Sequence, residues 1–120
     1  ADNIAFLGHR SDLTEILPVL DVVCIPSENE AFGLTIIESM ACGMPIIGSN
    51  TGSLPELVDA DSGVLVGPFD VPAWRDAMTT LIRDADTRKA MGLAARRRVE
   101  ERFSNKQHVK RLIEIYSASA

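Results

Sequence analysis

The 120-residue chain has no lysine or arginine between Arg10 and Arg75, although ten acidic residues lie in that interval. A segment with this charge balance repels polyanions and cannot hold nucleic acid by itself. Aromatic residues make up only 5% of the chain, and none lies within the densest basic cluster, Arg96–Arg98. Two glutamates follow that cluster closely, so it is interpreted as the solvated face of a helix. Nucleic acid is therefore not an expected partner.

Long apolar runs are also missing. No run reaches the roughly 18 residues of a membrane span, and no secretory signal stands at the start of the sequence. We therefore expect no membrane segment and a cytoplasmic location. The two cysteines, Cys24 and Cys42, lack the paired Cys or His spacing of a zinc site, so we expect buried free thiols rather than a disulfide. Neither a metal nor a cofactor is expected.

What the sequence does contain is an alternation of short apolar runs and helical patterns. Continuous runs rich in β-branched residues are typical of strands buried on both faces of a parallel sheet. The alternation predicts an α/β fold, a Rossmann-like parallel sheet with flanking helices, as a single domain over residues 1–120. Strands are predicted at residues 4–8, 21–26, 45–49 and 63–67. Helices are predicted over 12–20, 33–42 and 54–58, from Asp70 onward, around 91–103, and from Ser104 to the end of the chain.

The stretch SENEAFGLTIIESMACGMP, residues 27–45, joins a predicted strand to a predicted helix. Ligands of open α/β sheets bind at such junctions, and the amides of Phe32, Gly33 and Leu34 at the helix start suit a phosphate. Glu30 and Glu38 stand on either side, and carboxylates only accept hydrogen bonds. A phosphate-bearing segment flanked by hydroxyl-rich segments would satisfy all of these groups. A nucleotide-sugar has that layout.

The alternative is that both glutamates merely stabilise the start of the helix through its dipole. That explanation suits a carboxylate before the first turn. It accounts poorly for Glu38, which lies among Ile36, Ile37 and Met40.

The segment ENEAFGLTIIESMACGMPIIGSNTGSLPELV closely resembles the Glu-x7-Glu signature of the retaining GT-B glycosyltransferases, glycosyl transferases group 1. The stretches IAFLGH, LDVVCIPS, SGVLVGPFD and AMGLAARRRVEERFS resemble, in the same order, the second half of that family's C-terminal nucleotide-sugar-binding domain. The resemblance covers nearly the whole chain.

The resemblance implies transfer of a sugar from a nucleoside diphosphate, with retained anomeric configuration and without a metal. By resemblance, Glu30 would contact the hydroxyls of the donor sugar as a positioning and electrostatic catalytic residue, and Glu38 would hold the ribose hydroxyls. The turn at residues 32–34 would contact sugar and phosphate. His9 would lie in the loop that borders the base. The acceptor is not specified by any of these residues.

Three departures from the family pattern qualify this interpretation. Ser53 stands where a glycine is common, and Asn105 stands where a tryptophan is common. The arginine and lysine that neutralise the diphosphate in the family are also missing, which agrees with the scarcity of cations described above. We therefore expect a glycosyltransferase fragment that carries half of a donor site and is inactive on its own. Alternatives are a glycogen-synthase-like GT-B enzyme, a sugar-nucleotide epimerase, and a non-catalytic or engineered scaffold.

The same resemblance predicts an incomplete sheet. In the strand order 3-2-1-4-5-6, residues 4–8 correspond to the third strand and residues 21–26 to the fourth, so two strands that should separate them are missing. We expect residues 4–8 to move beside residues 21–26 and form a four-stranded sheet. Exposed strand edges recruit partners, so a homo-oligomer is also expected.

Overall fold

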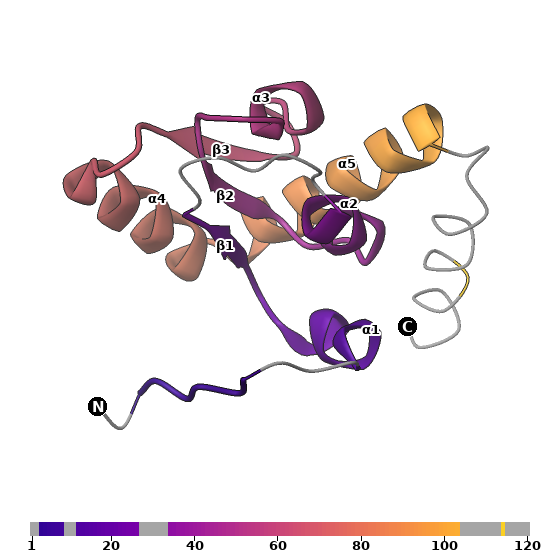
Figure 1. Ribbon diagram of the computed structural model, residues 1–120, viewed down its shortest axis with the longest axis horizontal. Helices are drawn as coiled ribbons and strands as arrows, with labels where there is room; N and C mark the ends of the chain where they lie inside the picture. The colour runs from indigo at the N-terminus through magenta and orange to yellow at the C-terminus, as the bar shows by residue number, and fades with distance from the viewer. Residues whose placement is uncertain (1–2, 9–11, 27–33, 104–113, 115–120) are drawn as a thin grey trace.

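The computed structural model describes residues 3–8, 12–26, 34–103 and 114. Its described part contains a three-stranded parallel sheet in the order β1-β2-β3, formed by β1 (Val23–Ile25), β2 (Ile46–Ser49) and β3 (Gly63–Val66) (Figure 1). Val23 pairs with Ile46, which in turn pairs with Gly63, so the three strands start at one edge of the sheet. The predicted α/β parallel sheet is thus confirmed.

Helices connect the strands, and most begin and end where the sequence places its signals. The Asp70 carboxylate accepts a hydrogen bond from the Ala73 amide at 3.1 Å and caps the helix that follows β3. Gly43, with φ +72°, ends the helix that precedes β2. The helices are α1 (Leu13–Ile16) with a 3-10 turn η1 (Leu17–Val19), α2 (Leu34–Ala41), α3 (Leu54–Leu57), α4 (Val71–Arg83) and α5 (Ala85–Phe103).

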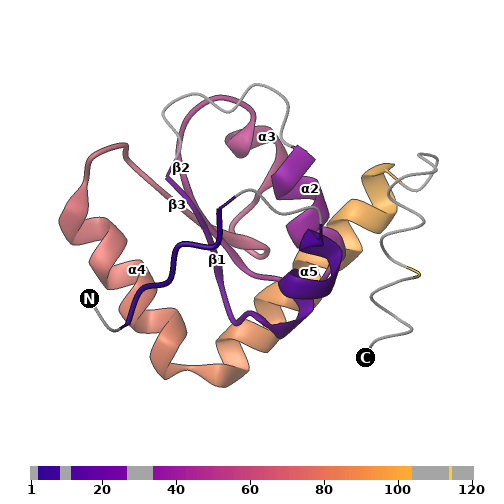
Figure 2. The ribbon, with the colours of Figure 1, turned by 60° about the horizontal axis from the view of Figure 1, so that its bottom comes forward.

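These elements form three layers. Figure 2 shows α4 on one side of the sheet and α2 with α5 on the other. Alternate residues of β2 face the two layers: Ile46 packs in the cluster with α2, α3 and α5, while Ile47 packs with Leu81 of α4. Both isoleucines are fully buried. This two-sided burial is why the strands appear in the sequence as continuous apolar runs.

The prediction of a strand at residues 4–8 is wrong. The segment is irregular, and Ile4, Phe6 and Leu7 are 65%, 96% and 57% exposed. The predicted 12–20 helix is shortened at Pro18, and Leu17 packs against Cys42 and Met44. Residues 4–8 pair with no strand of the described sheet, so the predicted fourth strand is missing from it.

The cysteine prediction is right for Cys42, which is buried, and wrong for Cys24, which is exposed on β1. Both thiols are free, as expected. Cys24 is accessible because β1 is an edge strand in the described part of the sheet.

Two further expectations can be placed. The last predicted helix, from Ser104, lies outside the described residues except for Glu114, which is helical. Among the described helices, none combines the length and apolar character that a membrane span requires.

Candidate functional site

The three parallel strands all end at the same edge of the sheet, and helices start beyond it. Residues 26–33 lead from β1 to α2, residues 50–53 lead from β2 to α3, and residues 67–70 lead from β3 to α4. Carboxyl ends of parallel strands are the usual ligand-binding edge of such sheets. We call this part of the molecule the carboxyl edge.

Helix α2 begins at Leu34, close to the predicted start, and its backbone follows the loop that carries the first half of the Glu-x7-Glu motif. The helix is anchored by Ile36, Met40 and Ala41, which are almost completely buried. Ser39 is buried as well, and its hydroxyl donates to the Thr35 carbonyl at 2.8 Å. The helix start is therefore held firmly against the sheet.

Glu38 lies in the second turn of α2 and is half-buried. The pKa of the Cys42 thiol, one turn further along α2, is raised mainly by burial of the thiol. The negative charge of Glu38 raises it further, and the positive charge of Arg96 lowers it. Helix α2 packs against α5, which carries Arg96. The role of Glu38 in holding the ribose hydroxyls stays a prediction.

The other predicted site residues cannot be compared with the structure. His9, Glu30, Phe32 and Gly33 lie outside the described residues, and for Leu34 only the backbone is described. Their roles remain predictions.

The turn at residues 50–53 forms the neighbouring part of the carboxyl edge. The Asn50 amide donates to the Val66 carbonyl at 2.8 Å and ties the turn to β3. Gly52 adopts φ +58°, a conformation that glycine takes without strain. Leu54 is fully buried, and a Cβ atom at Gly48 would lie only 2.8 Å from its side chain. The turn is thus fixed from the β2 side by close packing.

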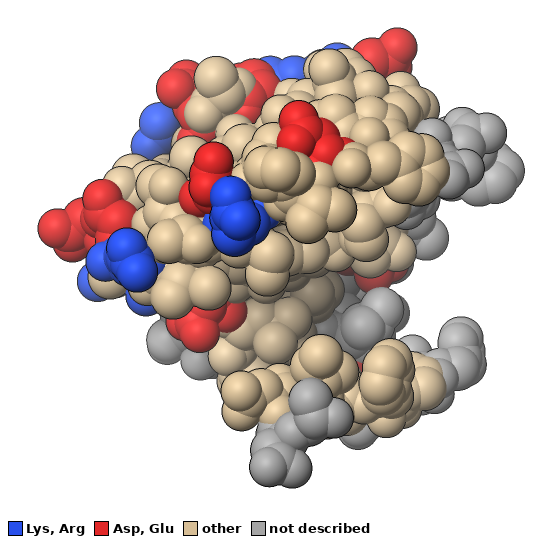
Figure 3. Space-filling model, turned by 90° about the vertical axis from the view of Figure 1, so that its left-hand side faces the viewer, with Lys and Arg blue, Asp and Glu red and all other residues tan. Residues whose placement is uncertain are grey.

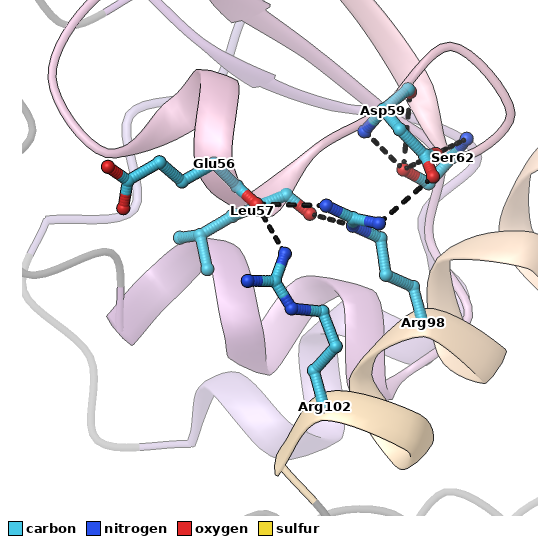
Figure 4. Close-up of polar contacts among 6 residues, drawn as sticks. All are labelled: Glu56, Leu57, Asp59, Ser62, Arg98 and Arg102. Carbon is cyan, nitrogen blue, oxygen red and sulfur yellow. Dashed lines mark hydrogen bonds and ion pairs between the residues drawn. The ribbon is translucent and has the colours of Figure 1, made fainter.

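The interpretation of Arg96–Arg98 as a solvated helix face is wrong for Arg98. Its guanidinium donates to the Leu57 carbonyl at 2.7 Å and the Glu56 carbonyl at 2.9 Å, and pairs with the Asp59 carboxylate at 3.1 Å (Figure 4). Arg102 also donates to the Glu56 carbonyl, at 2.6 Å. Arg97 is the exposed member of the triplet, while Arg96 is half-buried and pairs with Glu100.

Helical geometry could have revealed this position from the sequence. Three consecutive helix residues span about 200° of the helix circumference, so they cannot all face solvent when neighbouring positions are buried. Ala95 and Val99 are fully buried, and Arg98 lies beside Val99 on the flank of that face. The basic triplet thus had to place one member at the edge of the core.

Asp59 connects this arginine to the start of β3. Its carboxylate accepts from both the hydroxyl of Ser62, at 2.8 Å, and the Ser62 amide, at 3.0 Å. These bonds, led by that of the hydroxyl, lower the pKa of Asp59, and Arg98 contributes in the same direction. Ser62 itself is fully buried.

A hollow of about 550 Å³ lies elsewhere, beside Pro45 at the start of β2. It is lined in part by Gly43, Arg88, Lys89 and Arg96. Two of the three cations in this lining already have partners. Arg88 donates to two carbonyls in the last turn of α4, and Arg96 pairs with Glu100. It lies at the start of β2, at the opposite end of that strand from the carboxyl edge.

Charges on the side of the molecule where α4 lies are mixed. Figure 3 shows acidic and basic residues interspersed among uncharged ones on this face. Arg75 and Asp76 of α4 approach each other there at 3.7 Å, with both side chains largely exposed. Within the described ranges, no group of three or more His, Cys, Asp or Glu residues is placed to hold a metal ion.

The family model described as "Glycosyl transferases group 1" matches residues 1–98. The chain belongs to this family. The assignment to glycosyl transferases group 1 is therefore confirmed, and the α/β sheet with helices on both faces agrees with it.

Curated relatives of this glycosyl transferases group 1 chain include two bacterial enzymes. N-acetyl-alpha-D-glucosaminyl L-malate synthase of Bacillus anthracis is 35% identical over 116 residues, which are 96% of this chain and 30% of the relative. D-inositol 3-phosphate glycosyltransferase of Corynebacterium diphtheriae is 41% identical over 98 residues, which are 79% of this chain and 23% of the relative. The chain thus spans less than a third of the length of these relatives.

Solved structures of similar fold include a sucrose-phosphate synthase and a protein in complex with UDP-glucose. Sucrose-phosphate synthase of Thermosynechococcus elongatus superposes with a TM-score of 0.83 at 31% identity, over 98% of this chain and 30% of that one. HepE of Anabaena in complex with UDP-glucose superposes with a TM-score of 0.81 at 26% identity, over 98% of this chain and 32% of that one. HepE has also been solved with UDP.

Proposed function

We propose that this chain is the donor-binding part of a glycosyltransferase and binds a nucleoside diphosphate sugar at its carboxyl edge. The observation that carries the proposal is the similarity to HepE, whose structure holds UDP-glucose and superposes over 98% of this chain. The family match and the strand-to-helix geometry of α2 support the same conclusion.

The proposed division of work is the one that the family resemblance implies, and the chemistry of the groups agrees with it. The Glu38 carboxylate accepts hydrogen bonds from the ribose hydroxyls, and the backbone at residues 32–34 contacts the diphosphate. Glu30 contacts the transferred sugar and stabilises it in the reacting position. His9 borders the base. None of these residues is assigned to the sugar acceptor.

Retention of anomeric configuration, a cytoplasmic location and a homo-oligomeric state are further parts of the proposal. They rest on the sequence. We also propose that the chain by itself transfers no sugar, because helix amides beside an excess of carboxylates lack the countercharges that stabilise a departing diphosphate.

The test is a calorimetric titration of the chain with UDP, repeated for Glu38→Ala. Removing hydrogen bonds to a charged group should weaken binding by about 1.5–3 kcal/mol. Glu101→Ala removes an exposed carboxylate of α5 and serves as the matched control, for which we expect unchanged affinity. An unchanged dissociation constant in Glu38→Ala, together with lower thermal stability, would instead assign Glu38 to the helix dipole and contradict the proposal.

A further inference from the structure

The contacts between α5 and α3 point to a role for an arginine far along the chain from the Glu-x7-Glu motif. We propose that Arg98, assisted by Arg102, is a positioning residue for the donor site: it fixes α3 and thereby the 50–53 turn at the carboxyl edge. This inference rests on the proposed function, because it assigns a purpose to that turn.

Helix α3 cannot hold its own position. It has four residues, and helices of one turn are unstable in isolation because few hydrogen bonds offset the ordering of the backbone. Its placement must therefore come from tertiary contacts. The structure provides two sets of these, one at each end of the helix.

At the start of α3, the contact is apolar. Leu54 is fully buried and packs over Gly48 of β2 so closely that a Cβ atom there would be 2.8 Å away. This packing fixes how deep the start of α3 lies. It does not fix the tilt of a one-turn helix, which can pivot about a single side chain.

At the end of α3, the contacts are polar and come from α5. Arg98 reaches three acceptors with one planar group: the carbonyls of Glu56 and Leu57, and the carboxylate of Asp59. Figure 4 shows the two arginines converging from α5 on the last carbonyls of α3. Cations at the C-terminal end of a helix also interact favourably with its dipole. A guanidinium with fixed donor directions determines the orientation of the helix as well as its place.

The Arg98 contacts extend to the turn through backbone hydrogen bonds. The amides of Glu56 and Leu57 both donate to the Ser53 carbonyl at 3.2 Å. The Leu54 amide donates to the Thr51 carbonyl at the same distance. Rotation of α3 would therefore move residues 51–53, which follow the end of β2 at the carboxyl edge.

The same helix carries a matched control. Arg88 donates to the carbonyls of Leu81 and Ile82, the last residues but one or two of α4, at 2.7 and 2.8 Å. It secures the end of a helix as Arg98 does, but beside the hollow at the opposite edge of the sheet. A purely structural effect of losing an arginine should therefore appear equally in both variants.

The experiment compares Arg98→Ala, Arg98→Lys and Arg88→Ala by UDP titration and by amide hydrogen exchange. Couplings of this kind change affinity by about two- to thirtyfold, and we expect a loss within that range for Arg98→Ala. Arg98→Lys should lie between this variant and the unchanged protein, because one ammonium cannot reach all three acceptors in the same geometry. Arg88→Ala should bind UDP as the unchanged protein does, even if it melts at a lower temperature.

Hydrogen exchange separates this inference from the proposed function. The amides of residues 56–58 should exchange faster in Arg98→Ala and keep their rates in Arg88→Ala, with or without UDP. If the unchanged protein binds no UDP, the proposed function fails and the exchange rates alone decide whether Arg98 positions α3. Equal loss of affinity in the two alanine variants, normal UDP binding by Arg98→Ala, or unchanged exchange at residues 56–58 would each overturn the inference.

Discussion

Phe69 lies in the segment after β3 with φ +64°, a backbone conformation that non-glycine residues rarely adopt. Its side chain is 79% exposed, so little packing offsets the cost of this conformation. The neighbouring hydrogen bonds, from the Asp70 amide to the Gly67 carbonyl and from the Val71 amide to the Phe69 carbonyl, hold the turn that leads into α4. The strain is therefore a consequence of how tightly β3 is joined to α4.

Phe69→Gly should raise the free energy of unfolding. A left-handed backbone costs a non-glycine residue about 1–2 kcal/mol, and part of the gain is offset by the greater freedom of glycine in the unfolded chain, so we expect about 0.5–1 kcal/mol. Urea denaturation followed by circular dichroism measures this difference. Phe69→Ala is the control, because it removes the ring but keeps the Cβ atom. Equal stabilisation by alanine would show that the ring, and not the backbone, is the source of the cost.

Prediction from the sequence at the residue scale succeeded where a residue acts through local chemistry. The Asp70 cap is an example, because the cap and its amide partner lie three residues apart. It failed for Arg98, whose partners lie 39 to 42 positions earlier in the chain. The charge of an arginine and its neighbours in the sequence predict only that such a residue is usually exposed. They do not show which backbone carbonyls at the end of another helix will lie within its reach in the folded protein.

At the scale of elements, β2 and β3 were predictable because burial on both faces makes a strand continuously apolar. Residues 4–8 have the same composition and form no strand among the described residues. Apolar composition indicates that a segment can be buried, but forming a strand also requires the edge of another strand to pair with. In the structure Ile4, Phe6 and Leu7 stay exposed, and an apolar pattern alone does not say whether a sheet edge is within reach.

In the candidate site, too, some features could be predicted from the sequence and others depend on tertiary contacts. Strand and helix order sufficed to place the junction of β1 and α2 at the carboxyl edge, and the structure confirms that α2 starts there. The spacing of Glu30 and Glu38 stays a prediction about their geometry, because the first of the pair lies outside the described residues. The contribution of α3 and α5 to that edge depends on tertiary contacts and could not be predicted from the motif.

At the scale of the whole molecule, the outer edge of β1 is a feature that favours self-association. In the described part of the chain no strand pairs with it, and a hollow of about 240 Å³ lined by Val22, Cys24, Met78 and Ile82 lies alongside. Exposed apolar strand edges recruit other strands. We therefore expect two copies to associate through this edge.

Sedimentation equilibrium at micromolar concentration should give the mass of a dimer. Replacing Cys24 with lysine places a charge on the edge strand and should shift the equilibrium toward the monomer, since charged side chains oppose strand pairing. Thr80→Lys, on an exposed position of α4 away from that hollow, is the control and should leave the mass unchanged. A monomer mass for the unchanged chain would contradict the expectation.

The claim that the whole molecule presents a donor site at its carboxyl edge is tested most directly by amide NMR spectra of the ¹⁵N-labelled chain during titration with UDP. We predict shifts concentrated in residues 26–38 and 50–54, which follow β1 and β2 in the chain. Residues 43–45 and 88–92, beside the hollow at the opposite edge, should keep their positions. Shifts centred on that hollow, or no shifts at millimolar UDP, would contradict a donor site at the carboxyl edge.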